Sequence, residues 1–337
     1  MKILFIRFSS IGDIVLTTSP LRSLKKEFPN VQIHFLTLEE NASLLEGNSN
    51  IDRLHVLEKQ AGVFRLISIG NYLNECGYEF VVDMHDSLRS KIIRSRMKSG
   101  KLYSLKKPRW KRFKLFEFHK NDFQKDFSQL GLYHSVIKEL LSQENQSSTS
   151  LFISESEKED VNILLSKNGF KGNKYIVCIP GAAWENKTWK PENYLKLFKY
   201  FKENEFEIIL LGTEKDIICN ECALIDDSLT NMAGKTGFRK SLSIISQAQL
   251  VIGSDTGFVH SAEALGIPAV MLLGPTSTET GAGVTKSNSM NIQVEDIWCR
   301  PCSQNGSRPC FRTEKFCMNS IQPESVINQI SRMVSVS

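Results

Sequence analysis

The chain has 337 residues and a net charge of +5, with 41% hydrophobic and 23% charged residues. This composition suits a globular protein of about two domains at roughly 150 residues each, and it excludes collagen-like and disordered chains. No run of about 18 to 20 uncharged apolar residues occurs, and Arg7 and Asp13 interrupt the first apolar run. We therefore expect neither a transmembrane helix nor a secretion signal, and so a cytoplasmic protein.

Short β-branched or aromatic segments alternate with amphipathic stretches, the pattern of βα units on a parallel sheet. The predicted strands are 2–8, 31–37, 53–57, 80–85, 101–105, 175–180, 207–212, 249–254 and 269–273. Helical periodicity is clearest over 193–204, 239–248 and 257–265. The polar segment 142–150 is the best linker candidate. We predict two doubly wound α/β domains, 1–150 and 151–337, that face each other across a cleft and bind ligands at the carboxyl ends of their strands.

Basic residues concentrate in one segment of an otherwise acidic chain. Between Arg89 and Lys120 there are thirteen basic residues and one acidic residue, Glu117. Aromatic residues such as Trp110 are interleaved with the cations, so the segment can meet phosphorylated glycolipid headgroups at a membrane surface. A solvated charged face is the alternative. A nucleic-acid partner would explain this segment but none of the loops described next, so we expect none. The candidate acceptor or membrane residues are Arg89, Lys111, Arg112 and Lys114.

Two loops that follow predicted strands carry residues suited to catalysis. The first contains Gly12 and Asp13 but lacks the other glycines of a dinucleotide-binding turn, so a dinucleotide cofactor is disfavoured. Asp13 is either a general base or a helix cap. The second loop begins with Pro180 and Gly181, and its Lys187 is either a cation for a phosphate group or a packed loop lysine.

The third loop joins a buried strand to a helix that starts near Gly257. Helix N-termini expose free N–H groups and bind anions. Thr256 can donate a hydroxyl hydrogen bond, Asp255 can accept one from a sugar hydroxyl, and His260 lies one turn into the helix. The strand–turn at Gly274-Pro275-Thr276 has similar character. A helix cap is the alternative for Asp255, but this combination is more specific than a lone capping residue.

Four cysteines near the C-terminus have metal-site spacing. Cys299, Cys302, Cys310 and Cys317 form the pattern C-x2-C-x7-C-x6-C, which is compatible with a structural zinc site. Free thiols and disulfides are the alternatives, and a reducing cytosol disfavours the disulfides. We interpret the other C-x2-C pair, Cys219 and Cys222, as packing residues.

The chain resembles glycosyltransferase family nine, the bacterial heptosyltransferases of lipopolysaccharide core assembly. The segments that carry the resemblance are RFSSIGDIVLTTSPLRSLKKEFP, VVDMHDSLRS, PGAAWENKTWKPENY, ISQAQLVIGSDTGFVHSAEALGIPAVMLLGPTS and the cysteine-containing tail that starts at WCRPC. The resemblance implies a GT-B fold, with two Rossmann-like domains and a last helix, 323–334, that returns to the first domain. It also implies a nucleotide-sugar donor and a phosphorylated glycolipid acceptor at the inner face of the cytoplasmic membrane.

By this resemblance, Asp13 matches the catalytic base and Lys187 the lysine on the donor phosphates. The implied donor-binding residues are Gly12, Gly181, Ala182, Ala183, Glu214, Asp255, Thr256, Gly257 and His260. Family members often carry small hydroxyl residues where Ala182 and Ala183 stand, which leaves the donor sugar open. The implied reaction is inverting transfer of a heptose, from ADP-heptose, to a lipopolysaccharide core or related glycan.

No D-x-D sequence occurs in the chain, so we expect no catalytic metal cofactor. Two other functions stay open on the same fold. One is transfer of a different sugar from another nucleotide-sugar, because the fold does not fix the sugar. The other is non-catalytic binding of a nucleotide-sugar or glycan.

Overall fold

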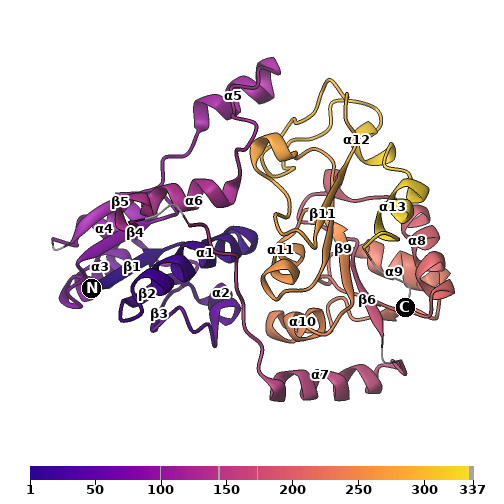
Figure 1. Ribbon diagram of the computed structural model, residues 1–337, viewed down its shortest axis with the longest axis horizontal. Helices are drawn as coiled ribbons and strands as arrows, with labels where there is room; N and C mark the ends of the chain where they lie inside the picture. Colours follow the sequence, from indigo (N-terminus) through magenta and orange to yellow (C-terminus); the bar gives the residue numbers. More distant parts are fainter. Residues whose placement is uncertain (99, 143–144, 173, 334–337) are drawn as a thin grey trace. The chain divides into compact units, whose positions relative to one another are not determined.

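The computed structural model describes residues 1–98, 100–142, 145–172 and 174–333 (Figure 1). It divides into two compact units. Unit 1 comprises Met1–Pro108 and Gln129–Phe152, and unit 2 comprises Arg109–Ser128 and the chain from Ile153 onward. The predicted domain boundary at residue 150 is thus close to the observed one. The sequence did not predict that residues 109–128 group with the second unit.

The predicted linker 142–150 belongs to unit 1, although its residues 143 and 144 lie outside the described part of the chain. Ser147 and Thr149 are buried. The backbone N–H of Ser147 donates to the Ser23 hydroxyl at 3.0 Å, and that of Ser150 donates to the Thr18 hydroxyl at 3.0 Å. The described part of the segment is therefore fastened to a helix of its own unit.

Unit 1 is a parallel sheet of five strands in the order β3-β2-β1-β4-β5. The strands are β1 (Lys2–Ile6), β2 (Gln32–Leu38), β3 (Arg53–Leu57), β4 (Phe80–Asp83) and β5 (Lys101–Ser104). Its helices are α1 (Ile11–Glu27), α2 (Glu39–Ala42), α3 (Val63–Glu75), α4 (Leu88–Ser95) and α6 (Gln129–Ile137), with short 3-10 turns η1 (Ser43–Leu45) and η2 (Lys138–Leu140). Because β1 is central, the topology reverses beside it, where α/β sheets bind ligands.

The central strand β1 is apolar on both faces, as a strand covered by helices on both sides must be. Its alternate residues Leu4 and Ile6 pack in a cluster with Leu66 and Leu73 of α3. Ile3, which points to the opposite face, is also fully buried. This two-sided burial explains why an uninterrupted apolar run correctly predicted the strand.

Unit 2 is a parallel sheet of six strands in the order β11-β10-β9-β6-β7-β8. The strands are β6 (Tyr175–Ile179), β7 (Glu207–Leu210), β8 (Thr230–Asn231), β9 (Leu250–Ser254), β10 (Ala269–Leu273) and β11 (Met290–Gln293). The helices and turns are α5 (Arg109–Phe118), α7 (Glu155–Lys167), η3 (Glu185–Lys187), α8 (Pro191–Glu203), α9 (Ile217–Ile225), α10 (Phe238–Ile245), α11 (Gly257–Ala264), η4 (Thr278–Thr280), α12 (Phe316–Asn319) and α13 (Pro323–Ile330).

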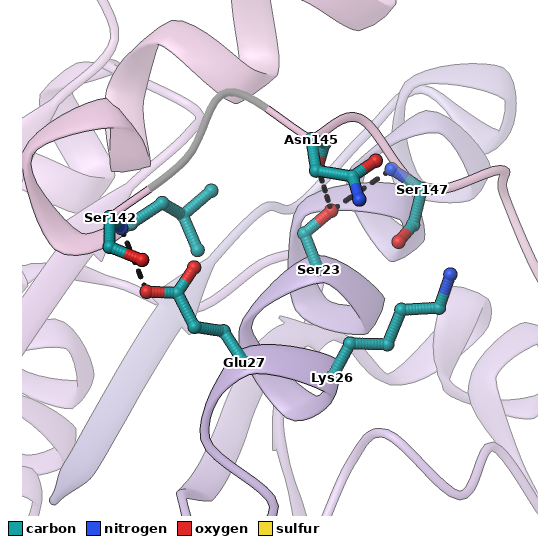
Figure 2. A pocket seen from close by; sticks show the side chains of 7 residues that line it. Ser23, Lys26, Glu27, Ser142, Asn145 and Ser147 are labelled. Atoms are coloured by element: carbon teal, nitrogen blue, oxygen red, sulfur yellow. Dashed lines mark hydrogen bonds between the residues drawn. The ribbon is translucent and has the colours of Figure 1, made fainter.

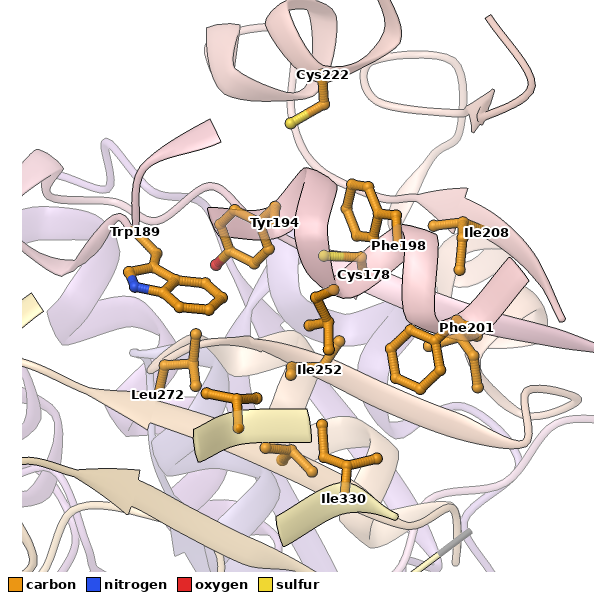
Figure 3. Close-up of a cluster of buried hydrophobic side chains, with 14 of the residues drawn as sticks. Cys178, Trp189, Tyr194, Phe198, Phe201, Ile208, Cys222, Ile252, Leu272 and Ile330 are labelled. Atoms are coloured by element: carbon orange, nitrogen blue, oxygen red, sulfur yellow. The ribbon is translucent and has the colours of Figure 1, made fainter. Parts of the chain in front are cut away.

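Alternate strand residues build a separate apolar cluster on each face of the second sheet. Ile176 of β6 and Ile252 of β9 belong to the cluster that Tyr194, Phe198 and Phe201 of α8 cover (Figure 3). The neighbouring strand residues pack instead with α7, α10 and α11. Cys219 and Cys222 are buried free thiols in the first cluster, which confirms their interpretation as packing residues.

The last helix, α13, packs on α8, and its Val326 and Ile330 are fully buried in the same cluster. It therefore groups with unit 2, where it covers the apolar face of α8, and the expectation that it returns to the first domain stays a prediction. Residue 334, at the end of the predicted helix, lies outside the described residues.

Candidate functional site

Gly12 and Asp13 lie in the first turn of α1, just after the carboxyl end of β1. Ser10 donates to Asp13 Oδ2 from its backbone N–H at 3.1 Å and from its hydroxyl at 2.7 Å. Nη2 of Arg7 lies 2.7 Å from the same oxygen. The other oxygen, Oδ1, accepts a 2.6 Å hydrogen bond from the Tyr133 hydroxyl on α6. Asp13 is therefore part of the N-terminal capping box of α1, and it also binds the side chains of Arg7 and Tyr133, which lie outside this helix.

These contacts keep Asp13 ionised. Burial would raise the pKa of Asp13, but the Arg7 charge and the hydrogen bonds from Tyr133 and Ser10 together lower it below its ordinary value. Burial and the Asp13 charge raise the pKa of Tyr133, so the phenol keeps its proton. About a quarter of the Asp13 side chain, 26%, is exposed, so an incoming hydroxyl group can reach this carboxylate.

His85 follows β4 and contributes a neutral imidazole to the same unit. Burial and the charges of Arg7 and Lys107 lower the pKa of His85 to about 4. Its ring packs edge-on against Phe8, with ring centroids 5.1 Å apart. Its Nδ1 atom is buried and has no hydrogen-bond partner among the described residues. His85 is therefore a polar group available to a ligand of unit 1.

In unit 2, Lys187 and Asp255 form a buried ion pair. Lys187 ends the turn η3 and is 8% exposed, and Asp255 follows β9. Nζ of Lys187 donates to the Asp255 backbone carbonyl at 2.7 Å and lies 3.0 Å from its Oδ2 atom. The Thr276 hydroxyl, after β10, donates to the same Oδ2 at 3.0 Å. The structure thus brings together three loops that follow neighbouring strands, β6, β9 and β10.

The groups around Asp255 keep its carboxylate ionised. Burial would raise the pKa of Asp255, but contact with His260 and the Lys187 charge lower it well below the ordinary value. Nε2 of His260 lies 3.8 Å from Asp255 Oδ1. The Lys187–Asp255 ion pair is therefore neutral overall.

The buried polar atoms near this ion pair that have no hydrogen-bond partner among the described residues include Oγ1 of Thr256, Nδ1 of His260 and Oγ of Ser277. Thr256 caps α11, and Gly257 is the first residue of that helix. Buried polar groups are rarely left unpaired, so such a gathering indicates a ligand that would pair them. Hydroxyl groups, a helix N-terminus and a lysine together suit a phosphate group.

The other predicted donor residues lie on neighbouring loops of unit 2. Gly181 follows β6, and a Cβ at this position would meet Oδ1 of Asp216 at 2.1 Å, so only glycine fits there. Ala182 is partly exposed, whereas Ala183 and Glu214 are exposed. These residues are therefore accessible, but they lack the buried contacts of Lys187.

The basic segment is divided between the units. Arg89 lies on α4 of unit 1, whereas Lys111, Arg112 and Lys114 lie on α5, which groups with unit 2. On α5 the exposed aromatic side chains are Trp110, Phe113 and Phe118. Trp110 stacks on Phe113 with centroids 5.3 Å apart, and the Lys114 ammonium lies 5.8 Å from the Trp110 centroid. No helix in the described part of the chain has the length and apolarity required to cross a membrane.

The four tail cysteines line one small pocket in unit 2. Burial raises the pKa of Cys317 to about 11 and also raises that of Cys302, so both thiols are protonated at neutral pH. Among the described residues, no three His, Cys, Asp or Glu side chains converge as a metal-binding group. The four cysteines thus line the same pocket but do not form a metal-binding group in the described structure, and the zinc site stays a prediction.

A cavity of about 290 Å³ lies at the opposite end of α1 from Asp13 (Figure 2). Ser23, in its wall, accepts a hydrogen bond from the Ser147 N–H and donates one to the Asn145 carbonyl, both of 3.0 Å. Ten helical residues separate Ser23 from Asp13, which corresponds to about 15 Å along the axis. This cavity is therefore separate from the Asp13 site.

A model of glycosyltransferase family 9 (heptosyltransferase) matches residues 66–309, well over half of the chain. The chain belongs to glycosyltransferase family 9. It is therefore a glycosyltransferase, and the predicted family is confirmed.

Two curated members of the family show how far the similarity extends. The chain is 26% identical to lipopolysaccharide heptosyltransferase 3 of Escherichia coli K12, over 79% of this chain and 80% of that protein. It is 24% identical to lipooligosaccharide heptosyltransferase 2 of Campylobacter jejuni, over 99% of each chain. This family 9 chain therefore spans most or all of the length of these relatives.

Solved structures confirm the fold. The E. coli ADP-heptose LPS heptosyltransferase II superposes with a TM-score of 0.74 at 19% identity, covering 99% of this chain and 98% of that one. The E. coli heptosyltransferase WaaC with ADP-2-deoxy-2-fluoro heptose has a TM-score of 0.69 at 16% identity, covering 99% and 100%. The predicted α/β class of GT-B type, with two parallel sheets, is confirmed for this family 9 enzyme.

Sequence reasoning missed several residues that complete these sites. Arg7 could have been found, because a charged residue directly after a buried strand needs a partner. The hydrogen bond from Tyr133 could not be predicted, since nothing in the sequence around Tyr133 indicates that it contacts Asp13. Thr276 lies in a turn whose character was noticed, but its bond to Asp255 could come only from the sheet order β10-β9-β6.

Proposed function

We propose that this family 9 enzyme transfers a heptose from ADP-heptose to a lipopolysaccharide core, with inversion at the anomeric carbon. The observation that carries the proposal is the set of unpaired polar atoms beside the Lys187–Asp255 pair, namely those of Thr256, His260 and Ser277. These groups suit a nucleoside diphosphate. The relatives named as heptosyltransferases, and the related structure with an ADP-heptose analogue, support the choice of donor.

Asp13 is the proposed general base. An acceptor hydroxyl oxygen attacks the anomeric carbon from the face opposite the diphosphate, its proton passes to Asp13, and the bond from the anomeric carbon to the phosphate oxygen breaks. The electron pair of that bond leaves with ADP. Because Arg7 and Tyr133 lower the pKa of Asp13, the proton is transferred late, when bond formation has already made the hydroxyl acidic.

Lys187 and the start of α11 are the proposed partners of the leaving diphosphate. Negative charge grows on that group as the sugar departs, and pre-placed donors stabilise it most in the transition state. The Thr256 and Ser277 hydroxyls can each donate one hydrogen bond to it. These groups would do the electrostatic work for which other glycosyltransferases use a metal ion, so we propose a reaction without a catalytic metal cofactor.

A product assay tests this function. Purified protein is incubated with a heptose-deficient lipopolysaccharide core and ADP-heptose, and with other nucleotide-sugars in parallel reactions, and products are identified by mass spectrometry. We expect transfer with ADP-heptose at a rate at least about ten-fold above that with any other donor, the discrimination that a few specific sugar contacts supply. Transfer with another donor alone would favour the second candidate sugar. Binding without product would favour a non-catalytic protein.

We further propose that α5 attaches the enzyme to the inner face of the cytoplasmic membrane, where its glycolipid acceptor lies. The exposed Trp110, Phe113 and Phe118 side chains can enter the headgroup region, and the surrounding cations can pair with anionic headgroups. Each lysine or arginine near an anionic surface adds about 1 kcal/mol of attraction.

Liposome flotation tests this attachment. Binding to anionic vesicles should decrease with added salt, and it should weaken by about 10²-fold when Lys111, Arg112 and Lys114 become Gln, since about 1 kcal/mol is lost for each of the three cations. The matched control replaces the exposed residues Lys167, Lys171 and Lys174 by Gln and should bind like the wild type. Equal binding by both triple variants would show that α5 is ordinary solvated surface.

A further inference from the structure

The cysteine-bearing tail, residues 299–317, packs on the loop that carries Lys187. The Asn186 side chain donates a 2.6 Å hydrogen bond to the Arg308 carbonyl. The Lys315 ammonium donates to the Glu185 carbonyl at 3.1 Å. Two residues of η3 are therefore fastened to the tail at Arg308 and Lys315, which both follow the tail loop 303–306.

Gly306, in that tail loop, lies directly against the stem of Lys187. A Cβ at position 306 would stand 2.8 Å from both Cγ and Cε of Lys187, closer than carbon atoms can approach. The backbone of Gly306 has a φ of +84°, which side-chain-bearing residues rarely adopt. The Ser303 hydroxyl accepts a 3.0 Å hydrogen bond from the Gly306 N–H and so fixes the loop. The tail backbone thus forms the wall behind the Lys187 side chain.

The same tail holds the neighbouring donor loop, Gly274–Thr276. Nε of Arg300 donates to the Gly274 carbonyl at 2.6 Å, and its Nη2 donates to the Thr276 carbonyl at 3.0 Å. The Cys302 N–H donates to the Pro275 carbonyl at 3.2 Å. Thr276 in turn binds Asp255, the partner of Lys187. The tail therefore contacts Lys187 directly through Gly306 and is connected to Asp255 through Thr276.

We infer that the tail is a wall of the donor phosphate site and that Gly306 is a positioning residue for Lys187. This inference rests on the proposed function, in which Lys187 meets the donor diphosphate. A lysine has a flexible four-carbon stem, and restricting that stem costs rotamer entropy. Packing against Gly306 restricts that stem in advance, so less freedom is lost when the diphosphate binds.

The test compares the binding of ADP and adenosine by isothermal titration calorimetry. In Gly306→Ala the new methyl group displaces Lys187, so ADP affinity should fall by about ten-fold or more, the scale of a misplaced catalytic group. Adenosine affinity should stay within two-fold, because adenosine lacks the phosphates. Gly169→Ala is the matched control, since Gly169 has a φ of +90° and open space around its Cβ position. It should bind both ligands like the wild type.

A second comparison separates positioning from general damage. In a Lys187→Ala background, Gly306→Ala should cause no further loss of ADP affinity, because the displaced side chain is absent. Asn186→Ala removes one tail contact without backbone strain and should show a smaller, ADP-specific loss. The inference would be overturned if Gly306→Ala lowered ADP affinity equally in the wild type and in the Lys187→Ala variant. It would also be overturned if neither Gly306→Ala nor Asn186→Ala lowered ADP affinity. Neither result would contradict the proposed function. Failure of the wild type to bind ADP would overturn the proposed function as well.

Discussion

The Tyr133 hydroxyl donates a 2.6 Å hydrogen bond to Asp13 Oδ1 although 120 residues separate the two in sequence. This bond is one of the interactions that lower the pKa of Asp13. In Tyr133→Phe the carboxylate loses a donor, so the pKa of Asp13 should rise. Since a protonated Asp13 cannot accept a proton, activity is lost as the pH falls through this pKa, and the acid limb of the kcat/KM profile should move to higher pH. Tyr103→Phe is the control, and an acid limb that coincides with the wild-type limb would contradict this role.

Replacing Asp13 itself should separate catalysis from donor binding. Asp13→Asn keeps the size of the side chain but removes the base, so turnover should fall by about 10²-fold or more. Donor affinity should stay within a few-fold, because the proposed phosphate-binding residues Lys187, Thr256 and Ser277 lie in unit 2 and Asp13 in unit 1. Steady-state kinetics and donor titration measure the two effects. Near-normal turnover would remove Asp13 from the mechanism.

Lys187→Ala should weaken both donor binding and turnover. In the proposed mechanism the ammonium group meets the phosphates in the ground state and again when charge grows on them in the transition state. The loss also leaves the buried Asp255 carboxylate without its cation, so the melting temperature must be measured beside the kinetics. Lys190→Ala, which removes an exposed lysine three residues away, is the control. Unaltered donor affinity in Lys187→Ala would assign the lysine to packing.

A buried cluster in unit 1 should make stability depend on pH. Nε2 of His55 lies 3.0 Å from the Tyr78 hydroxyl and 3.2 Å from His34 Nδ1. Burial, followed by the charges of His34, Arg53 and Lys2, lowers the pKa of His55 from 6.5 to about 4. Between these values the unfolded chain binds a proton that the folded protein does not. Stability is therefore full above about pH 6.5 and falls as the pH drops towards 4.

Urea unfolding at pH 7 and pH 5 measures this effect. For one such histidine the free energy of unfolding should fall by about 2 kcal/mol between the two pH values. In His55→Gln this decrease should be smaller by a similar amount, although the variant starts from a lower stability at pH 7. His119→Gln changes an exposed histidine and should keep the wild-type pH dependence. The same pH dependence in His55→Gln as in the wild type would refute the proposed role of the cluster.

The tail cysteines give a prediction about metal. Their spacing predicts about one zinc per chain in protein purified without chelator, and Cys302→Ser should lose the metal together with thermal stability. Metal binding would have to draw the thiols closer than they stand in the structure and remove the protons that burial now favours. Elemental analysis and thiol titration decide the matter, and a metal-free protein with four titratable tail thiols would end the zinc proposal.

Local patterns predicted most of the fold because the buried parallel strands are continuous apolar runs. The predicted strand 269–273 matches β10 residue for residue. The edge strand β11 (Met290–Gln293) was missed, because its sequence MNIQ is half polar and only one of its residues, Ile292, is buried. The grouping of α5 with unit 2 and of α13 with α8 depends on packing between distant segments, which no local pattern encodes.

The proposed donor and base residues could be named from the sequence because each lies on a loop or helix start that follows a predicted strand, which is a local signature. Of the partners of Asp13, Arg7 directly follows the same strand, β1, and could have been inferred, whereas Tyr133 lies on the distant helix α6 and could not. Gly306 is the clearest case. It lies in a polar loop whose sequence shows nothing unusual, and its role comes entirely from the lysine that packs against it.

The division of the chain has a consequence for synthesis on the ribosome. Unit 1 is interrupted by residues 109–128, which belong to unit 2. Glu117 in this excursion pairs with Arg308, and His119 packs against Trp298. These partners are made some 180 or more residues later, which takes about ten seconds or more at bacterial rates. During that time the aromatic, basic helix α5 and the residues after it lack these partners, so the nascent chain exposes aromatic surface long before its partners are synthesised.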